Sequence, residues 1–304
     1  MYMGFQPRIH IHADDYGMIS QSNERIRSCW EHGCIDGVSV MVNGRQPAMM
    51  GEHSMIPVAL HLNLVEGKPL SDPEKIPLLV RPDGFFAHAF FDLLLLSLSG
   101  KRKELERQLY LELDAQFLAF ARLYPAQREL SVDSHQHTHM IPLVFRTLLR
   151  VIWDRNLPVG YLRVPAEPIG PFFLEPSLYF TYRPVNLLKN VVLNVLWCFN
   201  RCVFRETGIS TSIFCGILFS GEMDEARLTR VFSHFCRLAC RKEQDIEFLF
   251  HPGAILPGEP FLDPQKTGFC DFYRSPGRQT DAKTVCSDTW RRLIGKSAEI
   301  SAEG

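Results

Sequence analysis

The sequence has no excess of either charge, no pattern typical of a secretory leader and no long uncharged apolar run. Lys and Arg number 33 against 34 Asp and Glu in 304 residues, so no overall field favours nucleic acid and we expect no such partner. The N-terminus lacks a basic region followed by an apolar stretch, which argues against a secretory signal. No run of about 18 uncharged apolar residues occurs, so we expect no spanning helix and a cytoplasmic location.

Cysteine occurs nine times but never as a Cys-x-x-Cys pair, which excludes zinc ribbons and thioredoxin-type redox sites. Cys198/Cys202 and Cys236/Cys240 have i, i+4 spacing, which would place each pair on one helix face. This scattered pattern is typical of small buried residues in a protein that is kept reduced.

Short apolar segments alternate with longer helical patterns along most of the chain. Strands separated by helices are typical of a parallel sheet or barrel, so we expect the α/β class and one barrel-like domain over residues 1–294. Residues 295–304 read as a polar tail. The predicted strands are 8–13, 38–42, 58–64, 131–135, 161–164, 211–219 and 246–250, and the predicted helices are 20–33, with Ser20 as N-cap, 101–123 and 142–156.

Two apolar segments, 85–99 and 185–204, interrupt this order, and the second lies in an expected helical insertion near 168–207. It carries Lys189 and Arg201 on a strongly apolar body. Two interpretations stay open. The segment is either a buried or partly buried helix, or an amphipathic helix that rests on the inner membrane surface or guides a lipid-linked substrate.

Polar residues are concentrated where the predicted strands end. In parallel α/β folds the site forms at the carboxyl ends of the strands, because the loops converge there. Six titratable residues at successive strand ends therefore predict one site, and they are Asp14, Asp15, His61, His135, Arg163 and His251.

Asp14 and Asp15 are adjacent at the end of the first predicted strand, which would direct their two carboxylates differently. One can then ligate a metal while the other accepts a proton. Because two carboxylates so close repel each other, a cation nearby is needed to keep both ionised.

The segment 132–140, VDSHQHTHM, is the most specific local signal. In an extended chain, His135 and His137 would point to one side, and a loop would turn His139 elsewhere. Three histidines beside Asp133 are rarely a packing solution, because buried histidine is costly without partners. Asp133 could orient a ligating histidine.

His61 interrupts another apolar strand, with Asn63 two residues later on the same face. Together with Asp15 and His135, His61 completes a set of two histidines and one carboxylate, which suits one divalent metal with open positions. Arg163 is available to keep Asp14 ionised. His251, at the end of the last predicted strand, can donate a proton.

These residues resemble the YdjC-like carbohydrate deacetylases, a family that includes chitooligosaccharide deacetylases and hopanoid-biosynthesis-associated members. The resemblance implies a distorted (β/α) barrel like that of NodB-type deacetylases. It also implies Asp15, His61 and His135 as metal ligands, Asp14 as general base held by Arg163, and His251 as general acid. Segment 185–204 and Phe219 to Met223 look closest to the hopanoid-associated branch. The matching motifs are HADDYG (12–17), SVMVNG (39–44), LHL (60–62), DSHQHTHM (133–140), RVP (163–165) and HPG (251–253).

The expected reaction is metal-dependent removal of an N-acetyl group from an amino sugar, carried by an oligosaccharide or a glycolipid. The metal is expected to be magnesium or zinc. The sequence predicts further residues around the ligands or against the substrate, namely Asn63, Asp133, His137 and His139. It predicts no oligomeric state. The alternatives are hydrolysis of another amide or of a phosphoester, and a catalytically silent relative that binds sugar or lipid. A glycosidase would need two carboxylates about 5–9.5 Å apart, which an adjacent pair does not suit.

Overall fold

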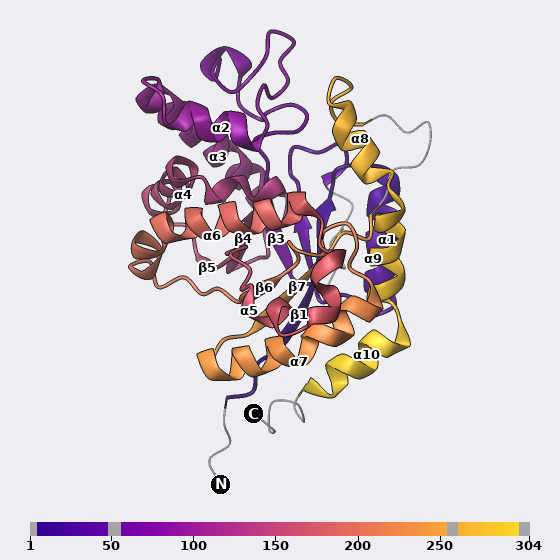
Figure 1. Ribbon diagram of the computed structural model, residues 1–304. Coiled ribbons are helices and arrows are strands. Elements are labelled where there is room, and N and C mark those ends of the chain that lie inside the picture. The colour runs from indigo at the N-terminus through magenta and orange to yellow at the C-terminus, as the bar shows by residue number, and fades with distance from the viewer. Residues whose placement is uncertain (1–4, 48–55, 254–260, 298–304) are drawn as a thin grey trace.

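A sheet of seven parallel strands forms the centre of the molecule (Figure 1). The computed structural model describes residues 5–47, 56–253 and 261–297. The strand order is β5-β4-β3-β2-β1-β7-β6. The strands are β1 Ile9–Tyr16, β2 Gly37–Val40, β3 Val58–Leu62, β4 Leu130–Ser134, β5 Val159–Leu162, β6 Ile213–Cys215 and β7 Ile246–Phe250.

The two edge strands, β5 and β6, are brought towards each other by the curl of the sheet. Ser210, just before β6, bridges to Tyr161 of β5 in parallel fashion. Its backbone N–H donates to Gly160 O at 2.9 Å, and its carbonyl accepts from Leu162 N at 3.0 Å. This bridge nearly closes the sheet, and the expected α/β fold with a distorted barrel is confirmed.

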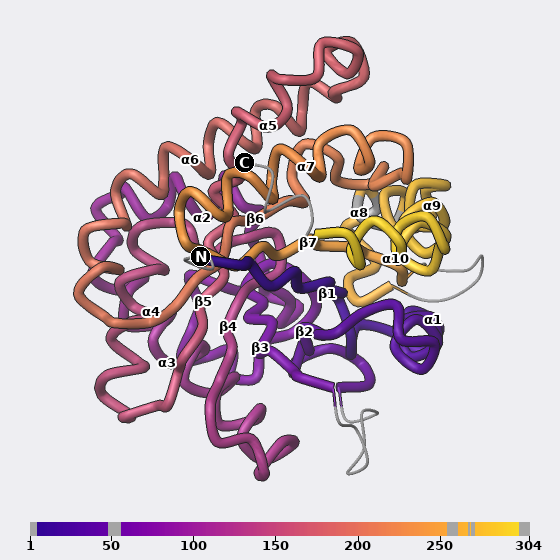
Figure 2. The backbone as a smooth tube through the Cα atoms, turned by 90° about the horizontal axis from the view of Figure 1, so that it is seen from below, coloured from indigo at the N-terminus to yellow at the C-terminus, as the bar shows by residue number. Residues whose placement is uncertain are grey.

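Helices surround the sheet, as the tube in Figure 2 shows from below. Most of them connect consecutive strands, as parallel pairing requires. They are α1 Ser20–Glu31, α2 Phe90–Ser97, α3 Arg102–Leu123, α4 Pro142–Asp154, α5 Gly170–Phe173, α6 Pro184–Arg205, α7 Glu225–Lys242, α8 Thr267–Tyr273, α9 Pro276–Val285 and α10 Asp288–Gly295, with 3₁₀ turns η2 Pro73–Lys75, η3 His135–Met140 and η4 Pro176–Thr181.

Several predicted boundaries were wrong, for local reasons. Ser20 was expected to cap α1, but Ile19 occupies the N-cap position and makes no side-chain cap bond. β6 ends at Cys215 rather than near Phe219, because the Glu167 carboxylate accepts the backbone N–H groups of residues 216–218 and draws the chain out of the sheet. α10 ends at Gly295, and residues 298–304 of the expected tail lie outside the described residues.

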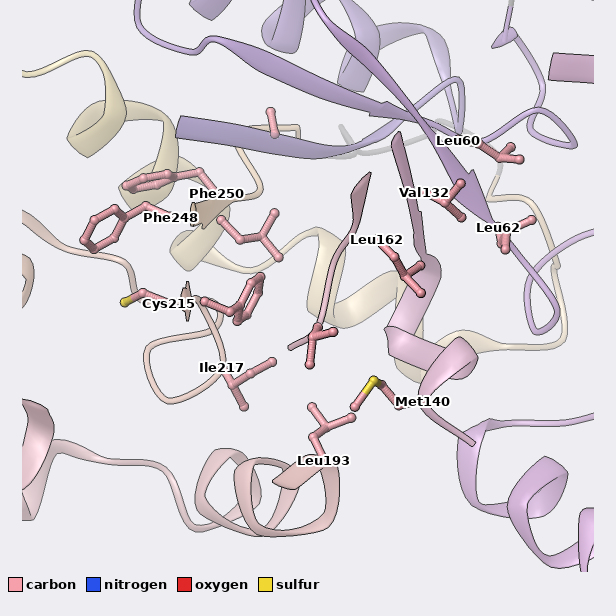
Figure 3. Close-up of a cluster of buried hydrophobic side chains, with 14 of the residues drawn as sticks. Leu60, Leu62, Val132, Met140, Leu162, Leu193, Cys215, Ile217, Phe248 and Phe250 are labelled. Atoms are coloured by element: carbon pink, nitrogen blue, oxygen red, sulfur yellow. The ribbon is translucent and has the colours of Figure 1, made fainter. Parts of the chain in front are cut away.

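The apolar core lies between the sheet and the surrounding helices. Leu60, Val132 and Leu162 from three neighbouring strands are fully buried. In Figure 3, Leu162 is the one of the three that lies nearest to Met140 of η3 and Leu193 of α6, with Val132 and Leu60 on the strands beyond it. Burying such side chains contributes roughly 1.5–3 kcal/mol each, and this core fixes the strand ends that carry the polar residues.

Segment 185–204 forms α6, and it is partly buried. Leu193, Leu196 and Phe204 are buried, whereas Val195 and Phe199 are at least half exposed. Within the described ranges, α6 is the one helix long and apolar enough to cross a membrane by length and composition. α6 is therefore partly buried, and contact of its exposed side with a membrane stays a prediction.

Candidate active site

The end of β1 carries two aspartates in an irregular backbone. Asp15 has a φ of 71°, and the pairing with β2 shifts register between Ala13 and Tyr16. A non-glycine residue with positive φ is strained and is often found at functional sites. Because of this irregularity both aspartates reach His61 of β3, with Asp14 Oδ2 4.0 Å from Nδ1 and Asp15 Oδ1 3.5 Å from Nε2.

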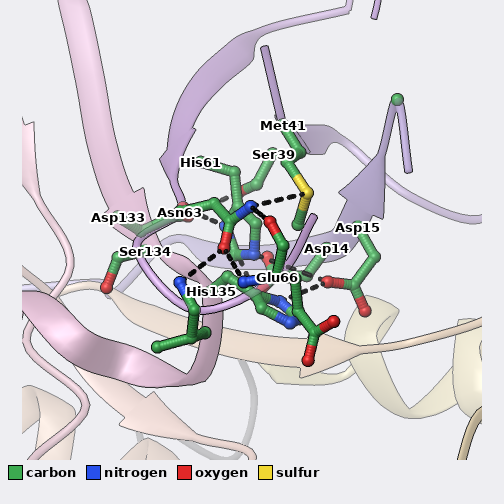
Figure 4. A network of polar contacts seen from close by, with 12 residues as sticks. Asp14, Asp15, Ser39, Met41, His61, Asn63, Glu66, Asp133, Ser134 and His135 are labelled. Carbon is green, nitrogen blue, oxygen red and sulfur yellow. Dashed lines mark hydrogen bonds and ion pairs between the residues drawn. The ribbon is translucent and has the colours of Figure 1, made fainter. Parts of the chain in front are cut away.

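Asp15, His61 and His135 converge at the carboxyl edge of the sheet (Figure 4). Asp15 Oδ1 lies 3.0 Å from His135 Nδ1 and 3.5 Å from His61 Nε2. Two ligands held at about 2.1 Å from one tetrahedral zinc ion are about 3.4 Å apart. His61 Nε2 is buried and has no hydrogen-bond partner. These residues fit a divalent cation, which would supply that partner.

The charges around this cluster also fit a cation. Ion pairs link four buried carboxylates, Asp14, Asp15, Asp133 and Glu247, to two buried guanidinium groups, Arg163 and Arg278. With the histidines counted as neutral, the four carboxylates outnumber the two guanidinium groups by two, so the cluster has a net charge of −2.

His61 responds to this imbalance. Burial alone would lower the pKa of His61. The carboxylates of Asp14 and Asp133 outweigh this effect and raise the pKa of His61 to about 10. In the absence of a metal the site therefore takes up a proton on His61, and a divalent cation would displace that proton.

Arg163, directly after β5, binds Asp14. Its Nη1 lies 2.9 and 2.8 Å from the two carboxylate oxygens. Burial raises the pKa of Asp14 to about 6, even though Arg163 lowers it. A carboxylate with a pKa near neutrality is suited to accept a proton, because it is ionised at neutral pH and still basic.

Sequence reasoning missed the partner on the other side of this guanidinium. Glu247 of β7 accepts from Arg163 Nε at 2.6 Å and also from the Tyr161 hydroxyl. Glu247 is the one charged residue in the strand sequence IEFLF. A charged residue within an otherwise apolar strand needs a buried partner, and this pattern could have identified Glu247 from the sequence.

Asp133 of β4 orients His61, in the geometry expected of a carboxylate behind a ligand. The Nδ1–H of His61 donates to Asp133 Oδ1 at 2.6 Å, which directs Nε2 towards Asp15. The Ser39 hydroxyl donates to the other oxygen. His12, Asp14 and Asp133 also lie close enough to share a cation, but Arg163 Nη1 already lies 2.8 and 2.9 Å from the two carboxylates.

The expected extended arrangement of His135 and His137 was wrong, whereas His139 does point elsewhere. Gln136 and His137 have φ values of 53° and 58°, so the chain turns sharply after His135 and is not extended. His137 packs edge-on against Phe214. His139 is buried between the Ser134 hydroxyl at 2.6 Å and the Arg163 carbonyl at 2.9 Å. Both ring nitrogens of His139 are therefore occupied, and this residue braces the backbone of Arg163.

Asn63 organises the loop after β3. Its side-chain oxygen accepts the N–H groups of Val65 and Glu66, and its amide donates to the Glu66 carbonyl at 2.7 Å. The Glu66 carboxyl that this loop carries is buried and has no hydrogen-bond partner, and burial raises its pKa to about 8. Figure 4 shows Glu66 beside the cluster. No local pattern in the sequence marks this residue.

The C-terminal helices complete the surroundings of Asp15. The Tyr273 hydroxyl donates to Asp15 Oδ2 at 3.1 Å, and Arg278 Nη1 lies 3.3 Å from the same atom. His251, directly after β7, is fixed by its backbone N–H, which donates to Asp281 Oδ2 at 3.0 Å. Burial and the Arg278 charge hold the pKa of His251 well below 6.5. Tyr273 and Arg278 lie on helices rather than at strand ends, so strand-end reasoning could not find them.

The structure thus brings five of the six predicted strand-end residues into direct contact. These are Asp14, Asp15, His61, His135 and Arg163. His251 lies at the same edge, where the charges of Asp15, His61 and Arg163 act on it. The arrangement can hold a cation, accept a proton at Asp14 and exchange a second proton at His251.

Known proteins resemble this chain in sequence and in fold. It is 33% identical over 168 residues to a carbohydrate deacetylase of Danio rerio, covering 54% of this chain and 52% of the relative. It is 28% identical over 164 residues to a chitooligosaccharide deacetylase of Serratia marcescens, covering 52% and 60%. The match to the first of these spans about half the length of that relative.

The fold has a counterpart among solved structures. A candidate cellobiose-phosphate cleavage protein of Enterococcus faecalis V583 superposes with a TM-score of 0.68 at 16% identity, covering 96% of this chain and 95% of that one. The model of the YdjC-like protein family matches residues 8–296, a range that contains every residue of the site. The chain therefore belongs to the YdjC-like protein family.

Proposed function

We propose that this chain is a metal-dependent carbohydrate deacetylase that hydrolyses the N-acetyl group of an amino sugar. The observation that carries the proposal is the convergence of Asp15, His61 and His135 beside the Asp14–Arg163 pair. The names of the relatives supply the substrate class. The acetylated sugar is part of an oligosaccharide or of a lipid-linked glycoconjugate, and the metal is magnesium or zinc.

Asp15, His61 and His135 would hold the metal. When bound, a divalent cation supplies a Lewis acid that polarises the acetyl carbonyl and lowers the pKa of water from about 15.7 towards 7. Asp14, oriented by both contacts to Arg163, takes the proton of the water that attacks the carbonyl carbon. A carbon–oxygen bond forms at this step.

His251 is assigned to the second proton transfer. The carbon–nitrogen bond breaks as the imidazolium of His251 gives its proton to the departing amine, leaving acetate and the free amino sugar. Because the surroundings hold the pKa of His251 well below 6.5, this imidazole is unprotonated at neutral pH, and the proton that it donates is the one that Asp14 removed from the attacking water. Buried Asp133 and His139 keep His61 and Arg163 in place.

Acetate release with and without chelator tests this assignment. We expect the purified chain to release acetate from N,N′-diacetylchitobiose or from a lipid-linked N-acetylglucosamine, and to release no phosphate from phosphoesters. EDTA should abolish the activity, and Zn²⁺ or Mg²⁺ should restore it. Acetate release that persists after complete removal of metal would overturn the metal assignment, and release from none of the acetylated sugars would overturn the function.

The pH profile should report Asp14. Its carboxylate is the active form, and the pKa of about 6 would be lowered further by a bound cation. The value of kcat/KM should therefore fall tenfold per pH unit below an apparent pKa at or below about 6. Measurement from about pH 4.5 to pH 8, with circular dichroism to confirm folding, checks this. An acidic limb centred above about pH 7 would exclude Asp14 as the base.

A further inference from the structure

Helix α6 turns polar side chains towards the protein. Asn186, Asn190 and Asn200 are buried, and they lie on the face that packs against η3 and α4. Their amide groups donate to the backbone carbonyls of Leu218 at 3.2 Å, Glu167 at 3.1 Å and Met140 at 2.8 Å, respectively. These bonds tie α6 to the loops that follow β6, β5 and β4.

The opposite face of α6 is apolar and exposed. Five large apolar residues on this face are half exposed or more, and we call them the outer apolar face: Val185 (55%), Leu188 (56%), Val191 (53%), Val195 (50%) and Phe199 (62%). The inward face also buries Leu193, Leu196 and Phe204, so α6 is apolar on both sides, whereas a surface helix in water carries polar residues on its outer face. A contiguous exposed apolar surface of this kind marks an interaction site.

The segment before α6 extends this surface. Phe173 is 58% exposed, Leu174 is 62% exposed and Phe180 is fully exposed. Figure 1 shows α6 crossing the front of the molecule, and Figure 2 shows the chain between α5 and α6 projecting from the body at the end of α6. Because this segment projects from the body, its aromatic and aliphatic side chains can enter an apolar environment while the hydrophobic core of the protein stays packed.

The charges of α6 favour an anionic partner. Its 22 residues include Lys189, Arg201 and Arg205 but no acidic residue, and these three cations are exposed. A symmetric dimer through this face would bring two cationic helices together. An anionic lipid surface instead attracts each cation by about 1 kcal/mol while the apolar side chains enter the lipid.

We propose that the outer apolar face docks the protein onto a bilayer that contains anionic lipids, with α6 lying in the plane of the interface. A helix that crossed the bilayer would have to detach its buried asparagines from their carbonyl partners, and hydrocarbon could not replace those bonds. α6 packs against η3, which carries His135. The docked protein therefore presents the site close to the lipid surface, which, granted the proposed function, narrows the substrate to a lipid-linked N-acetyl sugar.

Vesicle flotation tests the docking. The full chain should float with vesicles of phosphatidylcholine containing about 30% phosphatidylglycerol, and bind pure phosphatidylcholine more weakly. Val195→Asp places a charge in the centre of the outer apolar face and should lower the bound fraction at least about tenfold. The matched control is Leu118→Asp on α3, where the leucine is 47% exposed, and it should bind like the wild type.

Three results would overturn the proposal. The wild type could fail to float with the anionic vesicles, Val195→Asp could float as well as the control, or light scattering could show a dimer that only Val195→Asp dissociates. Acetate release from N,N′-diacetylchitobiose and from a lipid-linked N-acetylglucosamine, measured on the same preparations, separates this test from the proposed function. A chain that floats but releases no acetate from any substrate contradicts the function alone, and a chain that releases acetate but does not float contradicts the docking alone.

Discussion

Asp14→Asn is expected to bind a divalent cation like the wild type and to lose most of its turnover. Asparagine keeps the size of the side chain and an oxygen for Arg163, whose guanidinium now contacts both carboxylate oxygens. It cannot accept the proton of the attacking water. General-base catalysis contributes about 10²- to 10⁴-fold, so kcat for acetate release should fall by about that factor at unchanged pH.

Calorimetric titration with Zn²⁺ and acetate assays on the same protein would measure both halves of this prediction. The matched control is Asp83→Asn, which removes a carboxylate from an exposed ion pair with Arg81 and should leave both quantities unchanged. A variant of Asp14 that retains wild-type turnover would remove this residue from the mechanism. Loss of the cation together with turnover would instead make Asp14 a ligand.

His135→Ala should lose the cation itself. The His135 ring lies 3.0 Å from Asp15 Oδ1, and alanine leaves only Asp15 and His61 as ligands. Removing a residue that merely supports a ligand costs about 10- to 100-fold in affinity, so deleting a ligand should cost more than about 100-fold. Turnover should fall with metal content, and high metal concentration should restore it only in part.

His137→Ala is the control for this second prediction. It removes a histidine from the same six-residue turn, but His137 lies against Phe214 rather than against Asp15. Its cation affinity should match that of the wild type. Equal affinities for His135→Ala and the wild type would show that His135 is not a ligand.

The polar residues at strand ends were predictable because one rule covers them. An ionisable residue that ends or interrupts an apolar strand must have partners, and parallel strands bring such residues to one edge. This rule identified His61 and Arg163. In the structure, His61 forms a hydrogen bond with Asp133, and Arg163 forms one with Asp14. The alternation of strands and helices likewise predicted the fold.

The remaining features depend on tertiary contacts that have no local pattern. The left-handed backbone at Gln136 and His137 redirects two histidines that an extended chain would have aligned differently. Tyr273 and Arg278 reach Asp15 from more than 250 residues away in sequence. The orientation of α6 could not be predicted either, because its composition suits a buried helix. The burial of its residues and the carbonyl partners of its asparagines show which face is inside.

The ion pairs of Arg163 have a consequence for how the barrel assembles. This one guanidinium joins β1, β4 and β7 to the end of β5 through Asp14, Asp133 and Glu247. A closed sheet with a strand slipped by a residue would leave buried charges unpaired, at a cost of about 3–5 kcal/mol for each broken pair. Intermediates with a misaligned strand are therefore penalised, and the charged centre that serves the chemistry also enforces correct register when the barrel closes.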